Sequence, residues 1–271
     1  MNTEQLELLA NTNRRRIIDM VYEAGVGHVG GSLSVIDMLT AIYDRIDLKD
    51  PHRSKVVLSK GHVTPALYAC LTEKGIINES EYKTFRQVNS RLQGHPWTVA
   101  IPETDATTGL LGQGYSIAVG MAIVKRNRNE PGFVYAICGD GESAEGQIWE
   151  ALMCANKYKL GNLIFILDDN KLSSGGPTKD VMDLEPFAQK YEAFGIHTIT
   201  INGNSMKEVV SALNLAESYQ KGPVGIIMNT IKGKGVSYME SVGKWHSSGL
   251  TDEEYQTAVH ELTASREELE R

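Results

Sequence analysis

The sequence predicts an α/β fold with a parallel β-sheet and helices on both faces of the sheet. Segments typical of strands alternate with segments typical of helices along most of the chain, which is the pattern of βαβ units. The expected strands are almost continuous apolar runs, as in Leu163-Ile-Phe-Ile-Leu167, and strands buried on both faces have this composition. Because the sequence shows no repeat, low-complexity tract or linker, we expect residues 1–271 to form a single domain.

The individual elements follow from hydrophobic periodicity and from the residues at segment ends. Apolar residues at helical spacing predict a first helix that ends at Gly25 or Gly27, and a second such pattern follows Ser34. Thr251 and Glu254 have the spacing of a capping box and predict the start of a final helix. Strands are expected at residues 55–58, 133–138, 162–168, 197–201 and 223–229, and further helices at residues 112–125, 144–157, 184–193 and 206–219.

Composition narrows the class of protein. The net charge of −7 does not resemble the basic surface of a nucleic-acid-binding protein, and the apolar runs are too short to cross a membrane. The N-terminus is polar and has no signal-peptide pattern. Cys70, Cys138 and Cys154 are far apart in apolar surroundings, so we expect buried, reduced thiols. We therefore expect a cytoplasmic protein that binds neither nucleic acid nor membrane.

A glycine turn after the strand at residues 133–138 carries the first chemical signal. The turn is Gly139-Asp140-Gly141, and a helix-compatible segment follows it. Free N–H groups at the start of a helix bind phosphate, but Asp140 would repel a bare phosphate, and the glycine spacing does not match a dinucleotide-binding fingerprint. A bound Mg²⁺ removes the conflict, because this ion commonly joins carboxylates to substrate phosphates.

The next strand supplies further oxygen ligands for such an ion. It ends at Asn170, and neighbouring parallel strands end at the same edge of a sheet. We therefore expect the side-chain oxygen of Asn170 and the backbone carbonyl of Leu172 beside Asp140. A Gly-Asp-Gly sequence alone more often marks only a tight turn, and the asparagine after the following strand favours the metal site.

The spacing from Gly-Asp-Gly to Asn170 resembles the thiamine diphosphate motif, and other segments resemble the N-terminal domain of transketolases. These segments are AGVGHVGGSLSVIDML from residue 24, VVLSKGHVTPALYACL from residue 56, LQGHP from residue 92, TTGLLGQGYSIAVGMA from residue 107 and KLGNLIFILDDN from residue 159. They occur in the order of that family and cover roughly residues 10–250. The resemblance implies the thiamine diphosphate-binding fold of the diphosphate type. Leu110 departs from the pattern, because most transketolases have proline there.

The resemblance also implies roles for residues at the predicted metal site. Asp140, Asn170 and the Leu172 carbonyl match the Mg²⁺ ligands of the family, and Gly141 and Asn170 match its diphosphate contacts. In the GLLG segment, Gly109 and Leu111 match backbone positions on the aminopyrimidine side of the cofactor.

Four histidines match the active-site set of the family. The resemblance implies that His62 and His246 lie near the diphosphate and the reacting carbon, and that His28 and His95 lie near substrate hydroxyls. Imidazole suits these roles because it donates or accepts protons near neutral pH. Glu145 matches a family glutamate at the subunit interface, and the simpler alternative is a carboxylate that complements a helix dipole.

The function that the resemblance implies is that of the N-terminal subunit of a two-chain transketolase. Such an enzyme transfers a two-carbon ketol unit from a ketose phosphate to an aldose acceptor, through thiamine diphosphate and Mg²⁺. We expect no pyrimidine-binding or C-terminal transketolase domain in this chain, because no second set of strands and helices follows Thr251. A C-terminal transketolase subunit, in an α2β2 assembly, is therefore the expected partner, and sugar phosphates of the pentose phosphate pathway or more specialised sugars are the expected substrates.

Two alternatives remain at this point. The α subunit of a 2-oxoacid dehydrogenase also has a thiamine motif and a separate partner, but the histidine segments and GLLGQG argue against it. A non-catalytic regulatory or scaffolding subunit is the other alternative. The intact Asp140, Asn170 and histidine set argue against a decayed site.

Overall fold

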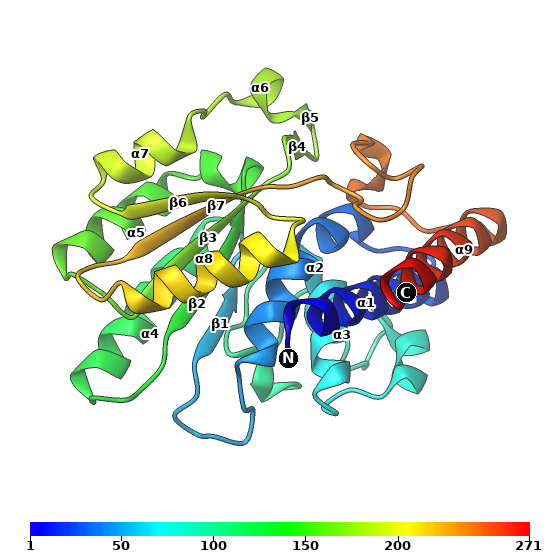
Figure 1. Ribbon diagram of the computed structural model, residues 1–271, viewed down its shortest axis with the longest axis horizontal. Helices are drawn as coiled ribbons and strands as arrows, with labels where there is room; N and C mark the ends of the chain where they lie inside the picture. The colour runs from blue at the N-terminus through cyan, green and yellow to red at the C-terminus, as the bar shows by residue number, and fades with distance from the viewer.

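The computed structural model describes residues 1–271 and contains a five-stranded sheet with strand order β1-β2-β3-β7-β6. All neighbouring strands of this sheet are parallel, and helices cover both of its faces (Figure 1). The strands are β1 (Lys55–Leu58), β2 (Val134–Gly139), β3 (Leu163–Asp169), β6 (His197–Asn202) and β7 (Val224–Asn229). The predicted α/β fold is therefore confirmed, and every predicted strand is present.

Helices form two layers around the sheet. The helices are α1 (Thr3–Ala24), α2 (Val29–Asp44), α3 (Thr64–Glu73), α4 (Gln113–Asn127), α5 (Gly146–Lys157), α6 (Thr178–Val181), α7 (Phe187–Ala193), α8 (Met206–Ser218) and α9 (Asp252–Leu269). Alternate residues of β3 point to opposite faces, so that Ile164 and Ile166 join one hydrophobic core with α1, α2, α3 and α8. Phe165 and Leu167 join a second core with α4, α5 and α7. Both faces of the sheet are thus buried, which explains its continuous apolar strands.

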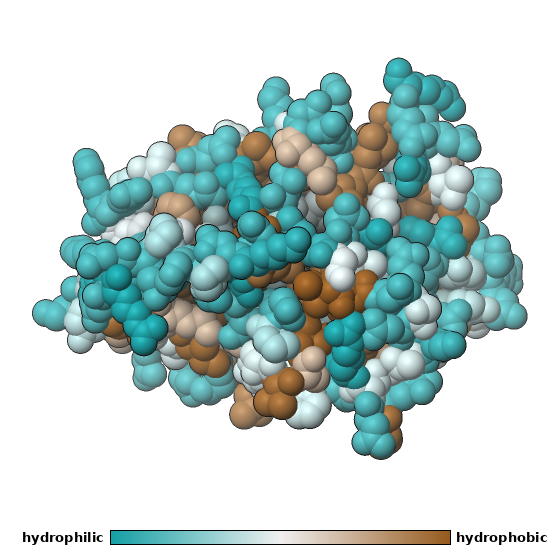
Figure 2. All heavy atoms as spheres, turned by 90° about the horizontal axis from the view of Figure 1, so that it is seen from below, coloured by the Kyte–Doolittle hydropathy of each residue, from teal (hydrophilic) through white to brown (hydrophobic).

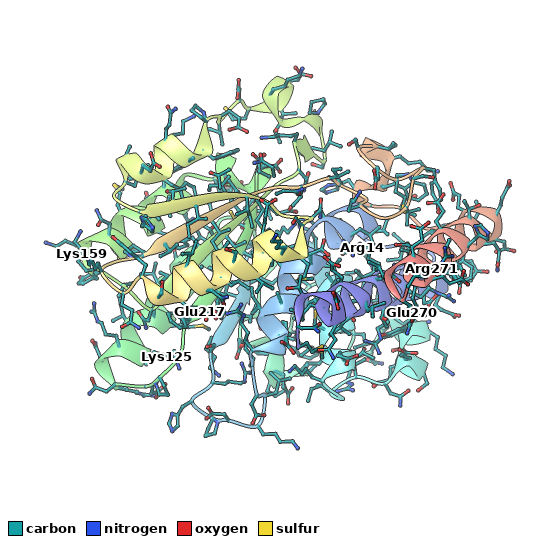
Figure 3. The ribbon with its side chains drawn as sticks, in the orientation of Figure 1. Arg14, Lys125, Lys159, Glu217, Glu270 and Arg271 are labelled. Atoms are coloured by element: carbon teal, nitrogen blue, oxygen red, sulfur yellow. The ribbon has the colours of Figure 1, made fainter.

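Ion pairs tie the helices of the first layer together, and Figure 3 labels one member of each pair, Arg14 and Glu217. Arg14 of α1 reaches Asp37 of α2, with 2.5 Å between the guanidinium nitrogen and the carboxylate oxygen, and both side chains are buried. Arg45, at the end of α2, contacts Glu217 of α8 at 2.9 Å. These pairs hold α1, α2 and α8 in fixed relation on one face of the sheet.

Three local expectations differ from the structure. The second helix begins at Val29, not after Ser34, and it includes two glycines that disfavour a helix on propensity alone. Packing explains why a glycine stands at position 30 of this helix, because a Cβ there would lie 2.8 Å from the Trp245 carbonyl oxygen. Helix α3 was not predicted. The segment at residues 171–183, predicted as a loop, contains the short hairpin of β4 (Leu172–Ser173) and β5 (Gly176–Pro177) and then α6.

The predicted helix ends are largely correct. Helix α1 ends at Ala24, and Gly25 follows with a positive φ of 67°. Helix α9 begins with the predicted capping box between Thr251 and Glu254. The helix expected at residues 184–193 begins later, at Phe187.

The surface, the cysteines and the helix lengths can be compared with the expectations from composition. Hydrophilic side chains predominate on the face shown in Figure 2, and hydrophobic atoms show through in small patches. Cys70 and Cys138 are free and buried as predicted, whereas Cys154 is only half-buried. No helix combines the length and the apolar character needed to cross a membrane.

A matched pair of glycines on α4 tests how closely this helix must approach β1. A Cβ on Gly114 would lie 2.5 Å from the Cα of Ser59, whereas a Cβ on Gly120 would meet nothing within 4 Å. Gly114→Ala should therefore lower the free energy of unfolding by about 1–3 kcal/mol, the usual effect of overpacking. Gly120→Ala should raise it by up to about 1 kcal/mol, because alanine favours the helix. Urea unfolding followed by circular dichroism measures both changes, and equal effects would contradict the close approach.

Candidate functional site

A cavity of about 290 Å³ lies at the carboxyl ends of the parallel strands. This is the edge at which open α/β sheets bind ligands. Residues predicted to bind the cofactor, the metal or the substrate all line it: His28, His62, His95, Gly109, Leu111, Asp140, Gly141, Asn170, Leu172 and His246. The strand register explains how distant parts of the chain meet here, because Gly139 at the end of β2 pairs with Asp168 near the end of β3.

Three of the predicted histidines form a close cluster. The ring centroids of His28 and His62 are 4.9 Å apart, and each lies 5.4 Å from that of His246. His28 precedes α2, and the backbone of its neighbour Gly27 exchanges two hydrogen bonds with Ser248, which fixes the His246 segment beside it. The structure therefore places His246 with the others, although its segment matches the family only loosely.

The histidines of the cavity favour the neutral form. Burial, together with the charge of a neighbouring histidine, lowers the pKa of His28 to about 4. Burial and the Lys232 ammonium lower the pKa of His246 to about 4. Burial also lowers the pKa of His62 and of His95, and nearby Lys60 and Arg86, respectively, add to the effect. Neutral imidazoles can accept or donate a proton at pH 7.

The donor set around Asp140 fits a hard divalent cation. Asp140 is 4% exposed, and its Oδ2 atom is buried with no hydrogen-bond partner. The Oδ1 atom accepts a bond of 2.7 Å from the N–H of Gly141. Burial raises the pKa of Asp140, and the charge of Asp168 raises it further. An orphaned, buried carboxylate oxygen requires compensation by a positive charge, and Mg²⁺ prefers oxygen ligands of this kind.

Asn170 and Leu172 complete an oxygen-rich wall beside Asp140. The Nδ2 group of Asn170 donates to Asp168 at 3.1 Å, and its Oδ1 atom accepts from the N–H of Leu172 at 3.2 Å. The Leu172 carbonyl accepts from Lys232 Nζ at 2.8 Å. No cluster of three or more His, Cys, Asp or Glu side chains is placed to hold a metal, so a cation here would depend on this mixed oxygen set and on oxygens of its ligand.

Asp168 is a buried hub that sequence reasoning missed. Its carboxylate is fully buried and accepts hydrogen bonds from Lys60, Ser34, Thr230 and Asn170. Although burial alone would raise the pKa of Asp168, the Lys60 ammonium holds it below its usual value. Lys60 lies two residues after the end of β1, so the rule that located Asp140 at a strand end also points to this lysine.

Lys232 is a second buried cation that was not predicted. Burial and the charge of Lys60 lower its pKa to about 8. Its Nζ atom lies 2.9 Å from Nδ1 of His246. Because an ammonium group only donates, Nδ1 must accept this bond and the ring proton of neutral His246 lies on Nε2. Lys232 thereby selects the tautomer of His246.

Two glutamates near the cavity differ in their exposure and in whether they line it. Glu142, which was not predicted, is 3% exposed and lines the cavity wall. Glu145 is exposed at the N-terminus of α5 and does not line the cavity. A Cβ on Gly112 would lie 2.7 Å from the Cβ of Glu145, so the glutamate lies against the start of α4.

Acidification tests whether the histidines are held neutral. The pKa of His28 and of His246 is lower in the folded chain than the unfolded value of 6.5, so the unfolded state binds more protons between about pH 4 and 6.5. Stability should therefore decrease as the pH is lowered from about 6.5 to about 4, by about 1 kcal/mol per histidine after allowance for partial exposure. His28→Gln or His246→Gln should reduce this slope in urea unfolding, and the exposed His260→Gln is the control. An unchanged slope would contradict the assignment.

Comparison with known proteins gives consistent matches along the sequence. The profile of the family described as "Transketolase, thiamine diphosphate binding domain" matches residues 6–268. One of the subunits of the apulose-4-phosphate transketolase of Phocaeicola vulgatus is 40% identical, over 100% of this chain and 98% of that protein. One of the subunits of a 6-deoxy-6-sulfo-D-fructose transketolase from a Clostridium species is 43% identical, over 97% of this chain and 98% of that protein.

Longer relatives and solved structures match over part of their length. Human transketolase is 35% identical over 96% of this chain, which spans 42% of that protein. The crystal structure of transketolase from Campylobacter jejuni superposes with a TM-score of 0.89 and 31% identity, over 99% of this chain and 46% of the other. The superposition confirms the predicted thiamine diphosphate-binding fold. The chain belongs to the transketolase family and corresponds to the thiamine diphosphate-binding domain of that family.

Proposed function

We propose that this chain is the N-terminal subunit of a two-chain transketolase, which transfers a two-carbon ketol unit from a ketose phosphate to an aldose acceptor with thiamine diphosphate and Mg²⁺. The observation that carries the proposal is the convergence of the oxygen set of Asp140, Asn170 and Leu172 with four histidines on one cavity. The strand-end position of this cavity suits a ligand with a phosphate tail.

The proposed roles at the metal end follow from the donor atoms. Asp140, Asn170 and the Leu172 carbonyl would hold Mg²⁺, and the orphaned Oδ2 of Asp140 supports this role. Gly141 would bring bare backbone to the diphosphate, since a Cβ there would lie 3.0 Å from the Cβ of Ser173. Lys232 would add a positive charge at the same end.

The remaining residues of the cavity would serve orientation and proton transfer, with His62 and His246 near the diphosphate as well as the reacting carbon. Gly109 and Leu111 would meet the aminopyrimidine side of thiamine diphosphate, which when bound supplies an electron sink for cleavage of a C–C bond. His246 presents its Nε2–H group as a donor, because Lys232 occupies its Nδ1 atom. His62 and His246 would serve the reacting carbon, and His28 and His95 the substrate hydroxyls.

A partner subunit forms part of the proposal. The relatives that this chain spans almost completely include proteins whose names describe them as transketolase subunits, and the human enzyme is more than twice as long as the matched region. Leu110 and its cavity-lining neighbour Leu111 are 80% and 39% exposed, so apolar surface beside the cavity is open to a partner. We therefore propose a C-terminal transketolase subunit in an α2β2 assembly located in the cytoplasm, with Glu145 at the interface.

The substrate class is proposed from the same relatives. Two of them are named for apulose-4-phosphate and one for 6-deoxy-6-sulfo-D-fructose, and each name describes a ketose with an anionic group. We propose a ketose donor with a terminal phosphate or similar anion for this chain, and an aldose as the acceptor.

Asp140→Asn tests the metal site in the complex of this chain with its partner. The variant keeps the size of the side chain but removes the charge, so Mg²⁺-dependent binding of thiamine diphosphate should weaken at least about tenfold, as for loss of a charge-assisted contact. Isothermal calorimetry measures the binding, and ketol transfer from a ketose phosphate should fall in parallel. Asp180→Asn, at an exposed position of α6, should bind like the unaltered protein.

Activity and binding assays of the chain and of its complex separate the alternative functions. Ketol transfer by the purified chain alone would contradict the need for a partner. Turnover of a 2-oxoacid but not of a ketose phosphate would favour a dehydrogenase α subunit. A complex that never binds the cofactor would favour a scaffolding subunit.

A further inference from the structure

A second buried carboxylate lies two residues after Asp140, and the proposed chemistry does not use it. Glu142 is 3% exposed and lines the cavity. Its Oε1 atom accepts from the Ser59 hydroxyl at 2.5 Å and from the N–H of Gly112 at 2.9 Å. Its Oε2 atom accepts from the N–H of Gly139 at 3.1 Å. The side chain thus binds three separate segments of the chain.

Each of these segments carries cavity residues. Ser59 directly precedes Lys60 and the short 3₁₀ helix (Gly61–Val63) that contains His62. Gly112 ends the segment that contains Gly109 and Leu111, and Gly139 ends β2 just before Asp140. The carboxylate therefore sits where the predicted aminopyrimidine contacts, the diphosphate contacts and a histidine are joined.

The Ser59 and Gly112 segments also approach each other too closely for side chains. A Cβ on Gly61 would lie 3.0 Å from the backbone nitrogen of Gly109, and a Cβ on Gly114 would lie 2.5 Å from Ser59. The hydroxyl of Thr108 donates to the Leu58 carbonyl at 2.7 Å, which adds a further link between the same segments. These two segments therefore set each other's position, and the Glu142 carboxylate joins both of them to the Gly139 segment.

A carboxylate suits this junction because an ionised one only accepts hydrogen bonds. All three partners of Glu142 are donors, and two of them are backbone N–H groups that cannot change their role. Glutamine has the same length. Its NH₂ group would replace one of the two carboxylate oxygens and would then face the N–H group of Gly112 or of Gly139. Aspartate is one methylene shorter and could not span the same distances.

Charge alone gives no reason for a glutamate at this place. An anion in the wall of a cavity repels a diphosphate, and Asp140 already contributes one negative charge there. The removal of the Glu142 charge should, by electrostatics alone, strengthen the binding of an anionic ligand. The opposite result is expected if the carboxylate acts through the geometry of the three segments.

We propose that Glu142 is a positioning residue that holds the Ser59, Gly112 and Gly139 segments in the arrangement needed to bind thiamine diphosphate. The proposal rests on the proposed function of the cavity. In this role Glu142 touches no reacting atom. It holds Ser59, Gly112 and Gly139 in place, and the cavity residues next to them in the sequence are positioned as a result.

Glu142→Gln tests the proposal with two independent readouts. In the purified chain, amide hydrogen exchange at Gly112 or at Gly139 should become about tenfold faster or more, because the N–H group that faces the new NH₂ loses its acceptor. In the complex with the partner, the Kd of thiamine diphosphate in the presence of Mg²⁺ should rise by about tenfold or more, although the variant removes a negative charge. Glu192→Gln, an exposed change of equal charge on α7, should alter neither quantity.

The outcomes separate this inference from the proposed function. If the unaltered complex does not bind thiamine diphosphate, the proposed function fails. If it binds and folded Glu142→Gln binds equally or more tightly, with unchanged exchange at Gly112 and Gly139, the positioning role is overturned. If Glu142→Gln does not fold, Ser59→Ala removes one of the three bonds and keeps the carboxylate. That variant should raise the Kd by a few-fold, and an unchanged Kd would overturn the proposal.

Discussion

The buried ion pair between Lys60 and Asp168 is the interaction on which the site depends. Both side chains are almost fully removed from water, and removal of two charges from water costs several kcal/mol per ion unless further hydrogen bonds compensate it. Ser34, Thr230 and Asn170 supply those bonds to Asp168. The pair therefore joins α2, the end of β1, the end of β3 and the segment after β7 into one unit beneath the cavity.

The same hub orients the proposed metal ligand. Asn170 has its amide NH₂ directed to Asp168, so its oxygen is left for other partners. The orientation of Asn170 is thus set by Asp168, a residue that does not itself line the cavity. Loss of either member of a buried ion pair commonly destabilises a protein by about 3–5 kcal/mol, because the other charge stays buried and unpaired.

The cavity combines groups of opposite charge with neutral bases. Lys60 and Lys232 are positive, Asp140 and Glu142 are acidic, and the four histidines favour the neutral form. A cation joined to a diphosphate matches such a mixed environment, because each ionic part finds a partner of opposite sign. The histidines are held neutral by burial and by neighbouring positive charges, so each ring offers one hydrogen-bond donor and one acceptor near pH 7.

The sequence alone determined the parallel α/β fold, the ends of α1 and α9, and the convergence of Asp140 with Asn170, because strand periodicity, capping residues and strand-end rules depend on neighbours in the chain. Only the tertiary structure decided the partners of Asp168 and the early start of α2, where Gly30 packs against the Trp245 backbone. It also decided the contacts of Lys232 with His246 and of Glu142 with its three donors. The physical reason is sequence distance. Lys60 and Asp168 are 108 residues apart, and the lysine side chain reaches Asp168 past Gly139 at the end of β2, in a strand order that no local pattern encodes.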